Sequence, residues 1–181
     1  MLFTYDLSMT STQALAGLAD NRTIHLVDPE NLFCGTAFDA AATSRLAGIY
    51  PHYDAAHDQV VIGASCMVTA VEAGLGWTGS RLVWRRGRDG ADLSLAAVML
   101  NEDLEHRFAR VIIGSGDGIF TPIAAYLASR GLHVGVVARH GHLSRTLRMA
   151  AHRVDYLPEE HFQSGIAPSG LIVPSAYRSA A

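Results

Sequence analysis

The chain contains 181 residues, which suffices for one domain that buries ~70% of the surface of its unfolded form. Hydrophobic residues make up 49% of the chain, charged residues make up 17%, and the net charge is −3, as in an ordinary soluble globular protein. This acidic balance does not favour nucleic-acid binding, so any such binding requires a local basic patch. No apolar run approaches the ~18 residues of a membrane-spanning helix, and we therefore expect no membrane partner.

The amino-terminal segment is predicted to precede the domain. Residues 1–22 form an N-terminal extension in which Ser11 to Ala19 can make one short helix. The first residues, Met1 to Asp6, lack a basic stretch and include an acid, which argues against a signal peptide. Cys34 and Cys66 each lie in an apolar segment, where we expect packed thiols of a reducing compartment rather than a disulfide or zinc ligands. These features predict a cytoplasmic protein.

A carboxylate follows the first predicted strand directly. Thr23 to Val27 is apolar and β-branched, which predicts a strand, and Asp28 stands at its carboxyl end. Pro29 fixes the turn, and the side chain of Asn31 can return a hydrogen bond to the loop or to Asp28. The alternative is an Asp/Asn turn before a helix with no further role.

The middle of the chain alternates strands and helices. Gln59 to Gly63 reads as a strand followed by a helix from Ala64 to Ala73, and Arg81 to Trp84 reads as a third strand. A helix is predicted from Ala91 to Leu104 because one helical face is apolar, namely Ala91, Leu95, Val98 and Met99. Asp92 falls in the first turn of this helix, where a carboxylate suits the helix dipole.

A glycine-rich loop follows the fourth predicted strand, Val111 to Gly114. Pro122 is tolerated in a first helical turn, so a helix must begin between Gly118 and Thr121. Between strand and helix, Asp117 stands between two glycines at the edge where open α/β sheets bind ligands. The glycines could cradle a phosphate, but their spacing is not that of a dinucleotide fold and the carboxylate would repel a pyrophosphate. An acid that binds a divalent metal is the better interpretation, and a simple helix cap is the remaining alternative.

The last third of the chain continues the alternation. The helix after Pro122 is predicted to end at Arg130-Gly131, and a fifth strand spans Leu132 to Ala138. A short helix from Ser144 to Ala151 and a possible sixth strand from Val154 to Leu157 follow. Residues 158–181 are rich in Pro, Gly, Ser and Ala and read as a C-terminal tail.

Apolar strands that alternate with helices predict an α/β fold with three layers, in which helices cover both faces of a mainly parallel sheet. At this point the chain resembles the NYN domain family, which has a PIN-like nuclease fold. The resemblance spans residues 23–157 and rests on the runs Leu-Val-Asp28-Pro-Glu-Asn31, Gly90-Ala-Asp92-Leu-Ser-Leu-Ala, Gly114-Ser-Gly-Asp117-Gly-Ile-Phe-Thr-Pro122 and Gly131-x-x-Val-x-Val.

The resemblance implies a sheet of order 3-2-1-4-5, in which the first and fourth strands are neighbours. Asp28, Asp92 and Asp117 would then converge as catalytic residues and as ligands of Mg²⁺ or Mn²⁺, since clustered carboxylates need a counter-cation. The implied activity is metal-dependent hydrolysis of phosphodiesters in RNA, with single-stranded RNA as the expected partner.

Polar and basic side chains near these acids are candidates for binding RNA, with solvated loop charges as the alternative. These candidates are Asn31, Ser115, Arg85, Arg86, Arg88, Arg139, Ser144 and Arg145. A zinc site at His140-Gly-His142 is not favoured, because no further ligands have suitable spacing.

The chain departs from the family pattern at positions where the family carries further acids. Ile119, Val98 and His152 stand there instead. A catalytically degenerate NYN domain that binds RNA or a protein is therefore an alternative, and a nucleotide-binding Rossmann-like protein is a lesser one. The apolar tail segment 171–173 also leaves room for a homodimer.

Overall fold

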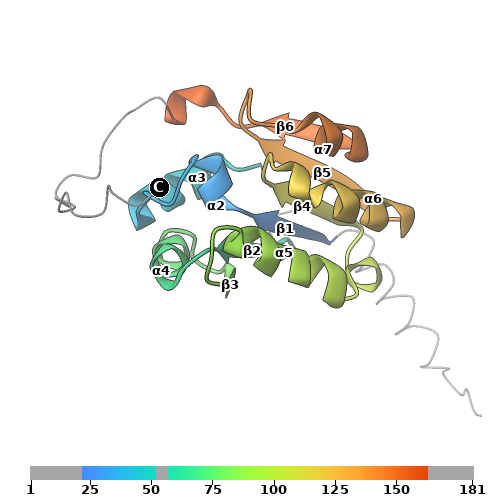
Figure 1. The fold of residues 1–181 in the computed structure, drawn as a ribbon, viewed down its shortest axis with the longest axis horizontal. Helices are drawn as coiled ribbons and strands as arrows, with labels where there is room; N and C mark the ends of the chain where they lie inside the picture. Colours follow the sequence, from blue (N-terminus) through green and yellow to red (C-terminus); the bar gives the residue numbers. More distant parts are fainter. Residues whose placement is uncertain (1–21, 52–56, 163–181) are drawn as a thin grey trace, which may run out of the picture.

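The computed structural model describes residues 22–51 and 57–162, and they form a three-layer α/β structure (Figure 1). Its sheet has six strands, all parallel, in the order β3-β2-β1-β4-β5-β6. The strands are β1 (Thr23–Val27), β2 (Gln59–Ala64), β3 (Arg81–Trp84), β4 (Arg110–Gly114), β5 (His133–Ala138) and β6 (Arg153–Tyr156). The predicted fold class, the implied strand order and the sixth strand are all confirmed.

Helices connect these strands, with short 3-10 turns beside several of them. The α-helices are α2 (Pro29–Leu32), α3 (Ala40–Ile49), α4 (Met67–Gly76), α5 (Gly90–Asn101), α6 (Thr121–Ser129) and α7 (Arg145–Ala150). The 3-10 turns are η1 (Leu104–His106), η2 (Gly118–Phe120) and η3 (Glu159–His161). The helix expected at 11–19 and the apolar segment 171–173 lie outside the described residues. Within the described ranges, no helix combines the length and apolarity needed to cross a bilayer.

Helices α3, α4 and α5 differ from the sequence-based prediction, and α5 ends at Asn101 rather than at Leu104. Helix α3 was not predicted, because its alanine-rich sequence has little helical periodicity. It is held by Asp39, whose side chain accepts a hydrogen bond from the Ala42 N–H at 2.7 Å, and by Glu72 of α4, which accepts one from the Ala40 N–H at 2.8 Å. Helix α4 begins at Met67 rather than Ala64, because β2 continues through Ala64 before the chain turns.

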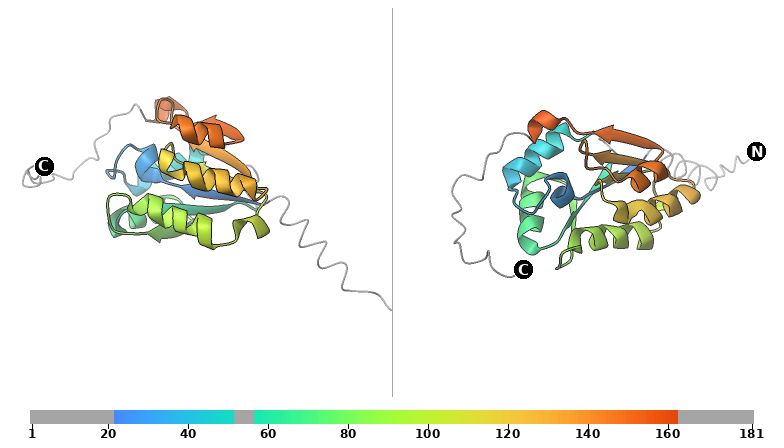
Figure 2. Two further views of the ribbon diagram at one scale, coloured as in Figure 1. Left: turned by 45° about the vertical axis from the view of Figure 1, so that its right-hand side comes forward. Right: turned by 45° about the horizontal axis from the view of Figure 1, so that its top comes forward.

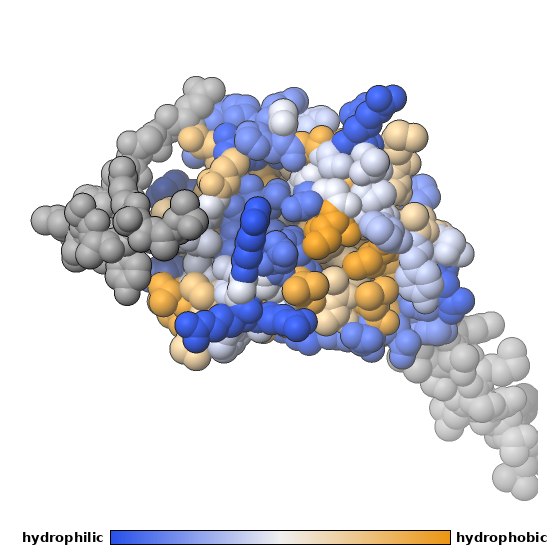
Figure 3. All heavy atoms as spheres, viewed as in Figure 1, coloured by the Kyte–Doolittle hydropathy of each residue, from blue (hydrophilic) through white to orange (hydrophobic). Residues whose placement is uncertain are grey.

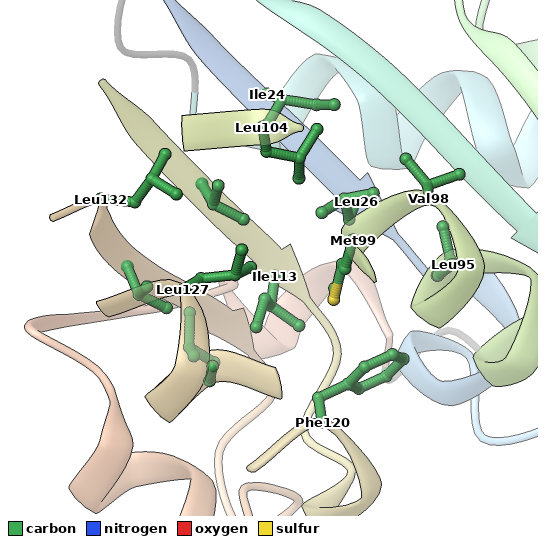
Figure 4. Packing of buried hydrophobic residues seen from close by; sticks show 14 of the residues in the cluster. Ile24, Leu26, Leu95, Val98, Met99, Leu104, Ile113, Phe120, Leu127 and Leu132 are labelled. Atoms are coloured by element: carbon green, nitrogen blue, oxygen red, sulfur yellow. The ribbon is translucent and has the colours of Figure 1, made fainter. Parts of the chain in front are cut away.

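Two apolar clusters hold the layers together, one on each face of the sheet. The right-hand view of Figure 2 shows α3 and α4 on one face and α5, α6 and α7 on the other. Neighbouring strand residues point to opposite faces, so Leu26 joins the cluster with α5 and α6 whereas Val27 joins the cluster with α3. Figure 4 shows Phe120 and Met99 packed together in the first cluster. Burying side chains of this size contributes ~1.5–3 kcal/mol each.

The register of β1 and β4 brings two loops to the same edge of the sheet. Val27 pairs with Gly114, and the Asp28 N–H donates to the Gly114 carbonyl oxygen at 3.0 Å. A Cβ at Gly114 would lie 2.7 Å from Tyr50 Oη and 3.2 Å from Val27 Cα, so this position has room for glycine alone. The carboxyl ends of the two central strands are therefore packed closely enough for their loops to interact.

Candidate functional site

Asp28 is a buried carboxylate at the end of the central strand β1. Its side chain is among the buried polar groups, with 3% relative exposure for the residue. Its Oδ1 accepts a hydrogen bond from the Asn31 N–H at 3.1 Å, which caps α2. The pKa of Asp28 is raised to about 8, mainly by burial; the negative charges of Asp92 and Glu30 also raise it, and the Asn31 N–H lowers it.

Asp92 is the partner of Asp28 across the site. It lies half-buried in the first turn of α5. Burial raises its pKa first and the charge of Asp117 second, whereas a side-chain hydrogen bond with Asp28 lowers it. Two carboxyl groups can share such a bond only if one of them holds a proton. Asp28 and Asp92 are therefore an acid pair that retains a proton near neutral pH.

Asp117 is the third predicted acid, and it is exposed at the start of η2. Its Oδ1 accepts a hydrogen bond from the Ile119 N–H at 2.9 Å, so it does cap the following turn. Its charge also acts on Asp92. Asp92 thus interacts with both of the other acids named from the sequence, although the three come from separate segments.

Sequence reasoning missed a fourth acid, Glu30. Its Oε1 accepts hydrogen bonds from the Ser65 N–H at 2.7 Å and from the Thr69 hydroxyl at 2.9 Å, which ties the loop after β1 to the start of α4. Its charge raises the pKa of both members of the acid pair. Glu30 stands within the Asp-Pro-Glu-Asn run that drew attention to Asp28, but the sequence does not show that its side chain points towards the acid pair.

The two loops at the sheet edge are fastened to each other through Asn31. Its Oδ1 accepts a hydrogen bond from the Gly116 N–H at 2.8 Å, in the loop after β4 and not in its own turn or at Asp28, where the sequence had placed this bond. Ser115 is fully buried, and its Oγ accepts from the Asp117 N–H at 3.2 Å, so it positions the loop instead of facing a substrate. The N–H groups of Gly116, Asp117 and Ile119 are all used internally. A phosphate cradle at this loop would need those same donors.

Basic residues lie on both sides of the acids. Arg85, Arg86 and Arg88 are exposed in the loop between β3 and α5, which is fixed to the end of β2 by the hydrogen bond from the Arg85 N–H to the Ala64 oxygen at 3.1 Å. On the other side, Arg145 is exposed at the start of α7.

The adjacent Ser144 holds α7 against the acidic loop, because its N–H donates to the Gly116 oxygen at 2.8 Å. Arg139 differs from the other arginines, since Glu159 at 3.3 Å and the Phe162 ring at 4.4 Å already occupy its guanidinium. Only 16% of its side chain is exposed.

The donor set can be tested for its fit to a divalent cation. Among the described residues, no three or more His, Cys, Asp or Glu side chains are arranged as an ion-binding group. The acids nevertheless offer the hard oxygen ligands that Mg²⁺ and Mn²⁺ prefer. Asp92 Oδ1 is buried without a hydrogen-bond partner in the described part of the chain, as an unfilled ligand position would be. The residues therefore fit one ion by their chemistry.

The three departures from the family pattern carry no carboxylate. Val98 is 3% exposed and packs in the core. His152 accepts a hydrogen bond from the Val134 N–H at its Nδ1. Ile119, two residues after Asp117, is 44% exposed, and Figure 3 shows apolar side chains gathered on the face of the molecule that carries α5 and α6. An exposed apolar side chain thus stands where the family carries a second acid.

Cys34 is not the packed thiol that the sequence predicted. It is exposed, and its backbone is left-handed with φ 58°. Its Sγ accepts a hydrogen bond from Arg139 Nη1 at 3.3 Å and lies 3.6 Å from His142 Nδ1. The prediction failed because the apolar neighbour Phe33 turns inward while the turn after α2 leaves Cys34 outside. Cys66 is half-buried, and both thiols are free.

A family model described as the NYN domain matches residues 67–158, about half of the chain, and this match includes Asp92 and Asp117. The chain belongs to the NYN domain family. A NYN domain has a PIN-like, nuclease-type fold, so the resemblance noted in the sequence is confirmed. Asp28 and β1 lie before the matched region, and the geometry alone connects them to the site.

A solved structure of similar fold was found by comparison with known structures. It is a protein of unknown function from Vibrio parahaemolyticus, which is 19% identical, with a TM-score of 0.50. The match covers 78% of this NYN domain protein and 96% of the other chain. At this identity the likeness shows the fold alone. No curated protein matches the chain.

Proposed function

We propose that this NYN domain protein is a metal-dependent ribonuclease that hydrolyses phosphodiesters of single-stranded RNA. The observation that carries the proposal is the acid pair of Asp28 and Asp92 beside Asp117, at the carboxyl ends of the central strands. A buried carboxyl with its pKa raised to about 8 destabilises the fold, and such groups are concentrated at functional sites.

The roles of the residues follow from their placement. Asp28, Asp92 and Asp117 would hold one Mg²⁺ or Mn²⁺, whose chemistry when bound is to polarise a phosphodiester and to lower the pKa of an attacking water. Asp28 has its pKa raised to about 8 and that of Asp92 is raised as well, which suits the pair to accept or return the proton of a reacting water. Asn31 and Glu30 fix the loops that carry these acids.

The exposed arginines on either side supply the local positive charge that an acidic protein needs to hold the RNA backbone. Arg85, Arg86 and Arg88 would contact phosphates on the β3 side of the acids, and Arg145 would do so on the β5 side. Because Glu159 and the Phe162 ring already occupy its guanidinium, Arg139 would stabilise the loop after β5 instead of binding phosphate.

Cleavage of a labelled single-stranded RNA with Mn²⁺ or Mg²⁺ tests the proposal. Asp117→Asn keeps the shape of the side chain and should reduce the cleavage rate by about 100-fold or more. Asp103→Asn is the matched control, because Asp103 is exposed in a left-handed conformation that Asn adopts readily. Equal rates for wild type and Asp117→Asn would reject the mechanism.

The second candidate is a degenerate NYN domain that binds RNA without cutting it, and the exposed Ile119 in place of an acid favours it. The two candidates differ in a thermal melt. The nuclease should gain in Tm when Mn²⁺ is added, since a ligand that binds only the folded state stabilises it, and Asp92→Asn should lose this gain. An unchanged Tm together with intact RNA binding would support the degenerate domain.

A further inference from the structure

We infer that His140 and Tyr156 form a stacking platform for a base of single-stranded RNA, beside the acidic site. This inference rests on the proposed function, because it names a subsite for the same substrate. It concerns residues that the sequence did not single out for this role. The platform lies at the carboxyl ends of β5 and β6, on the edge of the sheet that carries the acids (Figure 1).

The two rings are stacked and open to solvent. Their centroids lie 4.2 Å apart with an interplanar angle of 17°, so the two rings form a stacked pair on whose outer face a base can continue the stack. Tyr156 is 38% exposed and His140 is also exposed. Every nucleobase has a π-face, so an open aromatic surface of this kind binds bases of any sequence.

Both members of the platform are held in place by neighbouring residues. The His140 N–H donates to Glu159 Oε1 at 3.1 Å, which anchors the turn after β5. Tyr156 pairs with Ala138 in the sheet, and its hydroxyl accepts a hydrogen bond from Arg148 Nη1 at 3.4 Å. A base would therefore meet a surface that is already organised, which reduces the ordering cost of binding.

Helix α7 connects the platform to the acids. It begins beside the acidic loop, where Ser144 Oγ is close enough to Gly118 that a Cβ there would lie 2.9 Å away. Arg145 and Arg148 of α7 are both exposed, and Arg148 donates a hydrogen bond to the Tyr156 hydroxyl. Because neighbouring strands are about 4.8 Å apart, the end of β6 lies about 10 Å across the sheet from the end of β4. One RNA strand can therefore contact both the acids and the platform.

The chemistry of this surface favours single-stranded RNA over a duplex. Bases in a duplex are stacked on each other and offer no free face, whereas an unpaired base can stack on Tyr or His. The adjacent guanidinium groups suit the phosphates between such bases.

Binding of a fluorescent single-stranded RNA, measured in EDTA so that cleavage does not interfere, tests the platform. Tyr156→Ala should raise the Kd roughly 5- to 100-fold, the loss expected for one stacked base. Tyr156→Phe keeps the ring and should stay near wild type. Tyr126→Ala is the matched control, since Tyr126 is 46% exposed on α6 and is not part of the platform. His140→Ala serves as an independent variant if Tyr156→Ala does not fold.

RNAs with one abasic position each then identify the stacked base. An abasic site at the position that stacks on the platform should raise the Kd of wild type and should remove the difference in Kd between wild type and Tyr156→Ala. Abasic sites at other positions should leave that difference intact. Equal Kd values for wild type, Tyr156→Ala and His140→Ala would overturn the platform even if Asp117→Asn abolishes cleavage. If Tyr156→Ala raises the Kd but wild type cleaves no RNA, the nuclease proposal would be overturned and the stacking subsite would stand. If wild type binds no RNA at all, both proposals would be overturned.

Discussion

Asp28 is protonated in the folded protein over a pH range in which the unfolded chain has lost that proton. Its ordinary pKa of 3.8 is raised to about 8 in the folded protein, mainly by burial. The stability linked to this group is fully present below pH 3.8, falls as pH rises towards about 8, and changes little above that value. The negative charges of Asp92 and Glu30 act in the same direction.

Asp28→Asn should therefore stabilise the protein in EDTA, and by more at alkaline pH than at acidic pH. Asn remains neutral and still caps α2, so the gap in Tm over wild type should widen by at least about 2–4 °C, equivalent to about 1 kcal/mol, between pH 5 and pH 8.5. Asp39→Asn changes an exposed helix cap and serves as the control, with no widening expected. If the Tm of Asp28→Asn and the Tm of wild type change in parallel with pH, the raised pKa of Asp28 would be contradicted.

At the scale of elements, the acidic loop is held in place by close packing against the segment after β5. A Cβ on Gly116 would collide with the carbonyl oxygen of His142, and the Gly116 N–H is needed by Asn31. Gly116→Ala should therefore cost about 1–3 kcal/mol in urea unfolding and should also reduce RNA cleavage, because Asp117 is the next residue. Gly48→Ala is the control, since a Cβ there meets no atom within 4 Å and alanine favours the helix. Equal losses in the two variants would contradict the packing argument.

The four inner strands β1, β2, β4 and β5 were predictable because each is an apolar run bounded by glycine or polar residues, and burial on both faces requires such runs. Helix α3 was not, because its contacts with α4, such as the bond to Glu72, exist only in the folded chain. Asp28 and Asp117 were identifiable from their place at strand ends. The orientation of the Glu30 side chain and the proton shared by Asp28 and Asp92 depend on burial and on distances between separate segments. No local sequence pattern encodes these distances.

At the scale of the whole molecule, a net charge of −3 coexists with exposed arginines near the acids. If Arg85, Arg86 and Arg88 contact phosphates, each contact releases counterions when RNA binds, and the Kd depends on salt accordingly. Replacing all three with alanine should lower the slope of log Kd against log salt by about 2, because each contact with a single strand contributes about 0.7.

The control for this measurement uses arginines that are engaged elsewhere. Arg107 forms an ion pair with Glu102, and Arg130 forms one with Glu105, both near the amino ends of the strands. Alanine at these two positions removes positive charge from the molecule without touching the proposed path of the RNA, so the salt slope should not change. If the two sets of variants lower the slope equally per charge removed, the binding depends on net charge alone. If only the first set lowers it, the RNA backbone lies along the loop between β3 and α5, and the acids lie between that loop and the platform.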